Sequence, residues 1–248
     1  MSNQDFLGQV ALVTGGAGDI GAACCAELSS RGATVVAVDR VPRQGPPLDV
    51  LACDVTDEPQ VQAVVAGVAE RFGRIDVVVN CAGIEGDVAS LEAYPAEMFR
   101  QVLEVNVMGT FLITKSVLAL MRGQGTGSIV NLASMAGLLG SPNLSAYITS
   151  KHAVVGLTRA TAAEIAGTSI RVNAVCPGAV SGRMISSIDH GRTELEAALA
   201  ADLSARRRAL PRYGEPAEVA RVVAFLASSA ASYVNGTIMQ ADGGRSAV

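Results

Sequence analysis

Short apolar runs alternate with stretches of helical periodicity along this chain, and this alternation constrains its fold more than any other feature. The run QVALVT at 9–14 ends in a glycine cluster, a helical pattern follows at 20–31, and a second run, ATVVAV at 33–38, ends at Asp39. Continuous apolar runs are typical of strands buried on both faces, and a helix between two such strands connects them in parallel. The N-terminal segment therefore predicts a βαβ unit.

The alternation continues through most of the chain. Further strands are predicted at 48–53, 75–79, 128–132 and 169–175, with helices at 57–72, 95–121 and 145–166. Half of the 248 residues are apolar, which is enough to bury one substantial core. We predict an α/β fold with a single domain over residues 1–248, built as a doubly wound, Rossmann-like parallel sheet with helices on both faces.

Charge and composition argue against several classes of partner. The formal charge is −4, and aromatic residues make up only 4% of the chain. Nucleic acid is therefore not a predicted partner, because the net charge provides no attraction for phosphate backbones and base-stacking side chains are scarce. The longer apolar segments are interrupted by Arg, Glu or Gly, and the N-terminus has no leader pattern. We expect a cytoplasmic protein that binds no membrane.

The cysteines and histidines do not have the spacing of a metal site. The five cysteines contain no CxxC pair and lie mostly in apolar surroundings, which predicts buried, reduced thiols. His152 and His190 are far apart in the sequence and have no second ligand at a suitable spacing. No metal is expected.

A glycine motif lies between the first predicted strand and the first predicted helix. Gly16, Gly18 and Gly21 form GxGxxG at this turn, where free N–H groups and the helix dipole favour the pyrophosphate of a dinucleotide. Such glycines can also serve only to tighten a turn. The order of strand, loop, helix and second strand favours the dinucleotide interpretation.

An acidic residue follows at the end of the second strand. Asp39 lies eighteen residues after Gly21, where a carboxylate can accept hydrogen bonds from the adenosine ribose hydroxyls. Its charge would repel the extra phosphate of NADP, so NAD is the predicted cofactor. Neighbouring Arg40 could offset this repulsion, which leaves NADP as the alternative, and a solvated turn aspartate is the non-functional interpretation.

Tyr147 and Lys151 form a YxxxK pair, a spacing that places both side chains on one face of a helix. A neighbouring ammonium stabilises a phenolate, so Lys151 is expected to lower the tyrosine pKa from its usual value of ~10. Ser134 lies thirteen residues earlier, just past a predicted strand end, where open α/β sheets bind ligands. Its hydroxyl is expected to hold a substrate oxygen.

The segment NLASMAGLLGSPNLSAYITSKHAVVGLT at 131–158 resembles the catalytic segment of the short-chain dehydrogenase/reductase family, and the resemblance extends over nearly the whole chain. It implies that Tyr147 is the acid/base, that Ser134 binds the substrate oxygen, and that Lys151 tunes the tyrosine and binds the nicotinamide ribose. It also implies a role for Asn106, which holds a water molecule that links Lys151 to solvent. A homo-oligomer, usually a tetramer, is implied as well.

The resemblance and the glycine motif together give a set of predicted cofactor-binding residues. Besides Tyr147 and Lys151, these are Gly15, Gly18, Asp19, Ile20, Gly21, Asp39, Arg40, Asp54, Val55, Asn80, Ala82, Gly83, Pro177, Gly178 and Val180.

Three positions depart from the family pattern. Asp19 stands where a glycine is usual, and its carboxylate should weaken binding of the pyrophosphate unless it points to solvent or caps a helix. Gly182 replaces a threonine that commonly binds the nicotinamide amide, and Ser181 is a possible substitute. Cys81 replaces the second asparagine of the NNAG segment.

The family resemblance predicts a substrate lid at about 183–212. The residues expected to face the substrate are Ser141, Asn143, Met184, Ile185 and Ile188. The run Arg206–Arg208 has two interpretations: an anion site for a group such as a phosphate of coenzyme A, or basic residues at the end of a solvated helix, which the acidic residues at its start favour.

These observations predict an oxidoreductase that transfers a hydride between NAD(H) and a small secondary alcohol or ketone. The alternative is an NADPH-dependent 3-oxoacyl-thioester reductase. A third possibility, from a different class, is a dinucleotide-binding sensor or scaffold without catalytic activity.

Overall fold

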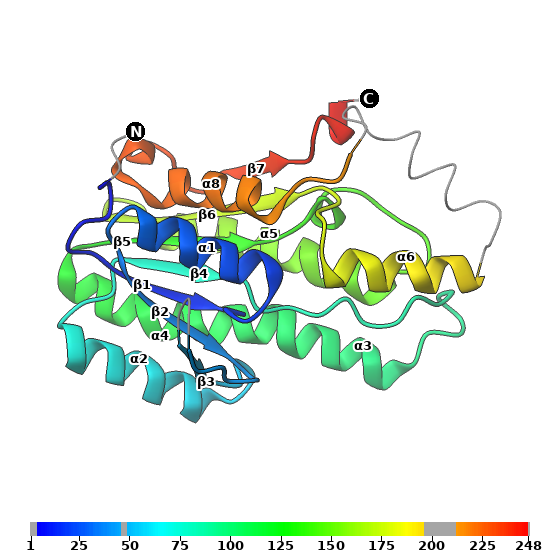
Figure 1. Cartoon of the computed structure of the whole chain (residues 1–248), viewed down its shortest axis with the longest axis horizontal. Helices are drawn as coiled ribbons and strands as arrows, with labels where there is room; N and C mark the ends of the chain where they lie inside the picture. Colours follow the sequence, from blue (N-terminus) through cyan, green and yellow to red (C-terminus); the bar gives the residue numbers. More distant parts are fainter. Residues whose placement is uncertain (1–3, 46–48, 196–211, 248) are drawn as a thin grey trace.

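The computed structural model of the chain describes residues 4–45, 49–195 and 212–247, and it contains one seven-stranded sheet (Figure 1). The strands are β1 Val10–Thr14, β2 Thr34–Asp39, β3 Val50–Ala52, β4 Val77–Asn80, β5 Thr126–Leu132, β6 Ser169–Pro177 and β7 Ile238–Ala241. All neighbouring strands pair in parallel, in the order β3-β2-β1-β4-β5-β6-β7. The predicted doubly wound Rossmann-like fold is confirmed.

The strand order reverses between β1 and β4. From β1 the chain proceeds outward to β2 and β3, then returns to β4 on the other side of β1 and continues outward to β7. The loops that leave β1 and β4 therefore diverge at the carboxyl edge of the sheet and open a crevice there. Figure 1 shows α6 beyond the ends of the strand arrows, on this side of the sheet.

Helices cover both faces of the sheet. They are α1 Asp19–Ser30, α2 Glu58–Phe72, α3 Ala96–Leu103, α4 Gly109–Gln124, α5 Ser145–Glu164, α6 Arg183–Leu195 and α8 Pro216–Ala227. Alternate side chains of β1 explain the two layers: Ala11 and Val13 pack with α1 and α8, whereas Val10 and Leu12 pack with α2 and α4.

A turn of π-helix, Glu104–Met108, joins α3 to α4 and contains the buried Asn106. Such turns often occur at functional sites. The whole stretch Ala96–Gln124 is long and apolar enough to cross a bilayer by length and composition, although the sequence analysis expected no such segment. It packs against α2, α5 and β5 in the manner of a core helix of a globular protein.

Two structural elements near the C-terminus lie outside the predicted set, namely α8 and β7. Helix α8 begins with Pro216 at its first position, after a capping box in which Glu215 and Glu218 bind each other's backbone N–H groups. Strand β3 is shorter than predicted, with three residues instead of six. The run Arg206–Arg208 and the part of the predicted lid from 196 to 211 lie outside the described residues.

Candidate active site

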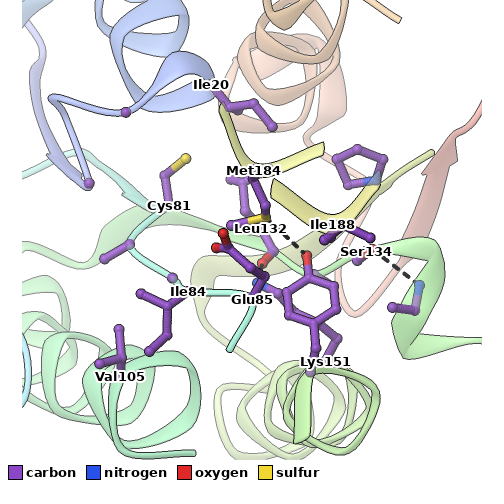
Figure 2. Close-up of a pocket in the computed structure, with 18 of the residues that line it drawn as sticks. Ile20, Cys81, Ile84, Glu85, Val105, Leu132, Ser134, Lys151, Met184 and Ile188 are labelled. Carbon is purple, nitrogen blue, oxygen red and sulfur yellow. Dashed lines mark hydrogen bonds between the residues drawn. The ribbon is translucent and has the colours of Figure 1, made fainter. Parts of the chain in front are cut away.

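A cavity of about 960 Å³ lies at the carboxyl ends of the strands, a volume that suits a dinucleotide together with a small substrate (Figure 2). The predicted cofactor residues that line it are Gly15, Gly18, Asp19, Ile20, Gly21, Asp39, Arg40, Asp54, Val55, Ala82, Gly83, Pro177, Gly178 and Val180. The predicted catalytic and substrate residues that line it are Ser134, Ser141, Tyr147, Lys151, Met184, Ile185 and Ile188. The structure thus brings together segments from most of the chain.

The glycine loop is too tight to accept side chains. Gly15 has a φ of +65°, and a Cβ there would lie 2.7 Å from the backbone nitrogen of Ala82. A Cβ on Gly21 would lie 2.0 Å from the carbonyl oxygen of Gly15. Thr14 fixes the neighbouring turn, since its hydroxyl accepts the N–H groups of Cys81 and Ala82, both at 3.1 Å. The glycines of this loop therefore present only backbone to the cavity, which fits a pyrophosphate group.

Asp39 lies at the end of β2 with both carboxylate oxygens bound to backbone. Oδ2 accepts the N–H of Ala17 at 3.1 Å, and Oδ1 accepts the N–H of Val41 at 3.2 Å. The carboxylate is thus held beside the glycine loop, and Arg40 next to it is exposed. Asp54 has a local role as well, because its Oδ1 accepts the N–H and the hydroxyl of Thr56.

Tyr147 lies in the floor of the cavity, almost fully buried. Its hydroxyl donates to the sulfur of Met184 at 3.7 Å, so the tyrosine contacts the first turn of α6 (Figure 2). Burial raises the pKa of Tyr147 to about 12, against the effect of a hydrogen bond with Ser134, which lowers it. The expected lowering below the usual tyrosine value is wrong for the protein without a bound cofactor, because desolvation is the largest effect.

Lys151 lies one helical turn further along α5, as the YxxxK spacing predicts. Its Nζ donates to the carbonyl oxygen of Leu132 at 2.8 Å and lies 5.6 Å from the centroid of the Tyr147 ring. Burial lowers the pKa of Lys151 to about 8. Burial therefore disfavours the charged form of both side chains. A bound ligand that brings charge into the cavity will shift the pKa values of both Tyr147 and Lys151.

Ser134 caps the short 3₁₀ turn Met135–Gly137. Its Oγ accepts the N–H of Ala136 at 3.1 Å. A hydroxyl that accepts in this way still has its own proton to donate. Ser134 can therefore donate a hydrogen bond to an oxygen in the cavity while its acceptor side holds the side chain in place.

Three predicted residues are close to the cavity without lining it. Asn106 is buried beneath it, where its side chain accepts the N–H of Ile84 at 2.8 Å and donates to the Ile84 carbonyl at 2.9 Å. Asn80 is buried within the sheet and donates to Asn131 and Thr114. Asn143 lies in a loop with a φ of +64°, and its carbonyl accepts the N–H of Ala89. These three residues therefore support the chain segments around the cavity and do not line it themselves.

The contacts of the buried Asn106 also reach toward Lys151. A Cβ on Gly83 would lie 3.1 Å from Asn106 Oδ1 and 3.6 Å from Lys151 Nζ. The two side chains thus lie on the same side of the backbone at Gly83. Asn106 fixes the chain that leaves β4 at the point where this chain borders the cavity.

Two of the departures from the family pattern meet in space. The Oδ2 of Asp19 accepts the backbone N–H of Arg183, the first residue of α6, at 2.8 Å. Gly182 lies against the same carboxylate and has a φ of +143°. The Asp19 carboxylate therefore does cap a helix, although the helix is α6 and not its own α1.

Glu85 is a charged residue that lines the cavity and lies outside the predicted set of site residues. It follows the NCAG segment, is half-buried, and points toward Met184 in Figure 2. Its negative charge contributes to the raised pKa of Tyr147. A carboxylate two residues beyond a family motif was the only signal in the sequence. His190, by contrast, is exposed and does not line the cavity.

Comparisons with known proteins agree with this geometry. A family model described as enoyl-(acyl carrier protein) reductase matches residues 15–246. The chain is 41% identical to levodione reductase of Leifsonia aquatica, over 98% of this chain and 96% of the relative. The chain belongs to the short-chain dehydrogenase/reductase family. Family members are NAD(P)-dependent oxidoreductases that act on alcohols and ketones.

Other short-chain dehydrogenases/reductases are similar over the whole length. Identity is 40% to 3-oxoacyl-[acyl-carrier-protein] reductase of Thermotoga maritima, over 96% of this chain and 97% of the relative. It is also 40% to cis-4-hydroxycyclohexanecarboxylate dehydrogenase of Sinomonas cyclohexanicum, over 98% of each.

Solved structures of the family have the same fold. That of levodione reductase is 40% identical with a TM-score of 0.88, covering 98% of this chain and 99% of the other. That of NAD⁺-bound xylitol dehydrogenase is 34% identical with a TM-score of 0.88, covering 95% and 98%.

Proposed function

We propose that this short-chain dehydrogenase/reductase transfers a hydride between NAD(H) and a small secondary alcohol or ketone, with Tyr147 as the acid/base. The observation that carries the proposal is the convergence of Ser134, Tyr147 and Lys151 on one wall of a cavity whose other end is the glycine loop and Asp39. The glycine loop and Asp39 would hold a nicotinamide dinucleotide, which would supply the hydride acceptor for the carbinol carbon and, in its oxidised form, a positive charge that favours the tyrosine phenolate.

The side chains of this chain supply the proton transfer. During oxidation, Ser134 donates a hydrogen bond to the substrate oxygen, and the Oη of Tyr147 takes the hydroxyl proton as the carbon–oxygen double bond forms. Lys151 in its charged form stabilises the phenolate that this step requires. In reduction, the same Oη returns the proton to the carbonyl oxygen.

The choice of NAD rests on Asp39. Its carboxylate is fixed by the N–H groups of Ala17 and Val41, so it cannot easily turn away from the position where an adenosine ribose is expected. A fixed negative charge would repel a 2′-phosphate. The NAD⁺-bound state of the xylitol dehydrogenase relative supports the same choice.

The substrate end of the cavity is mainly apolar. Leu144, Tyr147 and Ile188 pack together, with Met184 and Ile148 against them. This surface suits the ring of a small cyclic alcohol, which agrees with the cyclohexane ring in the name of one relative, cis-4-hydroxycyclohexanecarboxylate dehydrogenase. A screen of cyclic, aromatic, steroid and linear secondary alcohols, monitored by NADH fluorescence, tests this proposal.

A second candidate is reduction of a 3-oxoacyl thioester with NADPH. It is favoured by the Thermotoga maritima relative, a 3-oxoacyl-[acyl-carrier-protein] reductase. The same assay with an acetoacetyl thioester and each reduced cofactor distinguishes the two candidates. Faster turnover of the thioester with NADPH than of any ketone with NADH would establish the second.

The charge of Glu85 gives a prediction about pH dependence. Because the raised pKa keeps Tyr147 protonated at neutral pH, alcohol oxidation should become faster as the pH rises toward that pKa. Glu85→Gln removes a charge that disfavours the phenolate, so the rise should move to lower pH. The measurement is kcat/KM for NAD during alcohol oxidation across the alkaline range, because this parameter reports the pKa values of the enzyme before the cofactor binds.

The matched control for Glu85→Gln is Glu92→Gln, which neutralises an exposed carboxylate that does not line the cavity. Its profile should equal that of the wild type. A Glu85→Gln profile that is unchanged, or displaced to higher pH, would contradict the assigned effect of Glu85 on Tyr147.

A further inference from the structure

Asp19 and α6 are joined by a hydrogen bond across 164 residues of sequence, from the N–H of Arg183 to Asp19 Oδ2. We call this contact, together with Gly182 beneath it, the Asp19 bridge. Arg183 is the first residue of α6, and the first four N–H groups of a helix have no partner within it. A carboxylate at this position also interacts favourably with the helix dipole. Asp19 therefore stabilises the start of α6 from a different part of the chain.

Gly182 is what makes room for this carboxylate. A Cβ at position 182 would lie 2.4 Å from Asp19 Oδ2 and 2.8 Å from Asp19 Cγ. Contacts this short do not occur, so a side chain at 182 would displace the carboxylate. The two departures from the family pattern are thus explained by one another: the carboxylate at 19 requires glycine at 182.

The bridge links two walls of the proposed active site. Asp19 begins α1 beside Gly18 and Ile20, which line the dinucleotide end of the cavity, and Arg183 begins α6. The first turn of α6 is closed by Ser186, whose N–H and hydroxyl both bind the carbonyl of Gly182. Any movement of α6 away from the glycine loop must break the contact with Asp19.

The residues that follow the bridge reach the catalytic tyrosine. Met184 is next in sequence to Arg183 and accepts the hydroxyl of Tyr147 through its sulfur. Ile188, one turn later, packs against Tyr147 and Leu144. The position of α6 therefore determines both the apolar substrate surface and the access of dinucleotide to the cavity.

We propose that Asp19 is a positioning residue: the Asp19 bridge holds α6 over the cavity and slows the exchange of dinucleotide. The proposal rests on the proposed function for its dinucleotide, whereas the bridge itself belongs to the cofactor-free protein. The bridge also directs the Asp19 carboxylate toward α6, which reduces its repulsion of the pyrophosphate at the start of α1.

The first test uses the cofactor-free protein and measures hydrogen exchange of the Arg183 amide. A hydrogen bond to a charged acceptor slows exchange by roughly ten- to a hundredfold, so Asp19→Ala should accelerate exchange by about that factor. Asp19→Asn keeps an oxygen acceptor and should retain most of the protection. Unchanged exchange in Asp19→Ala would overturn the proposal.

A double-mutant cycle tests the pairing with Gly182. Gly182→Ala carries a backbone cost from its φ of +143° in either background, so this cost cancels in the cycle. Gly182→Ala should accelerate Arg183 exchange more in the wild type than in Asp19→Gly, because only the wild type has a carboxylate to displace. Fully additive effects would overturn the claim that Gly182 acts through Asp19. If Gly182→Ala does not fold, Arg183 exchange in Asp19→Ala and Asp19→Asn still tests the proposal.

The second measurement is the rate of NADH release, followed by its fluorescence after mixing with excess unlabelled NAD. Asp19→Ala should release NADH several-fold faster, and Asp19→Asn should remain close to the wild type. An unchanged release rate would overturn the proposal. Failure of the proposed function has a different signature. The Asp19 and Gly182 variants then change Arg183 amide exchange as expected, but the wild type turns over no alcohol or ketone.

Discussion

Replacement of Tyr147 by phenylalanine should lower kcat for alcohol oxidation by about 10²–10⁴-fold, which is the usual contribution of a general acid/base. The variant lacks the oxygen that takes the substrate proton, whereas the ring retains its packing against Leu144 and Ile188. NADH affinity should fall far less than kcat, because the glycine loop and Asp39 are untouched. Steady-state kinetics and a fluorescence titration with NADH measure the two effects.

The matched control is Tyr233→Phe, which removes the same hydroxyl from a fully exposed tyrosine. This variant should turn over as the wild type does. Full activity of a correctly folded Tyr147→Phe variant would show that another group transfers the proton. Tight NADH binding without turnover of any substrate in the wild type would instead favour the interpretation as a dinucleotide sensor.

The second large effect is expected at Asp39. Asp39→Ala should weaken NAD binding by about ten- to a hundredfold, because hydrogen bonds from the ribose hydroxyls to a carboxylate are lost. The same variant should bind NADP better than the wild type does, since the negative charge that repels its extra phosphate is gone. Titrations of each variant with both cofactors measure the change in preference.

Asp39→Asn separates the two contributions of this side chain. The amide keeps one acceptor and nearly the same shape but carries no charge, so NADP binding should improve while NAD binding falls less than in Asp39→Ala. A wild-type preference for NADP, or an Asp39→Ala variant with unchanged preference, would contradict the assignment of Asp39 to the ribose.

The sheet could be predicted from the sequence because its central strands are buried on both faces. Strands β1 and β4 are nearly continuous apolar runs, shorter apolar runs lie within β2, β5 and β6, and helical periodicity fills the gaps between the strands. Strand β7, with the residues IMQA, is short and only partly buried, so its pattern is too brief to separate from a loop. Strand β3, with the residues VLA, is also too short for the sequence pattern to define where it begins and ends.

The site could be predicted in part, for a related reason. Spacing on one helix placed Tyr147 and Lys151 together, and a strand end placed Ser134 near them. The raised pKa of Tyr147 depends on burial, which no motif reveals. The contact between Asp19 and Arg183 joins the first helix to the sixth, and only the three-dimensional structure brings those residues together.

The most direct test of the proposed function measures nicotinamide reduction by the wild-type protein with a panel of cyclic secondary alcohols at alkaline pH. We predict NADH formation with at least one of them, with a kcat/KM that is at least about tenfold higher for NAD than for NADP, since a single charged hydrogen bond contributes that much. If neither cofactor is reduced although both bind, or if NADP is preferred, the proposed function is wrong.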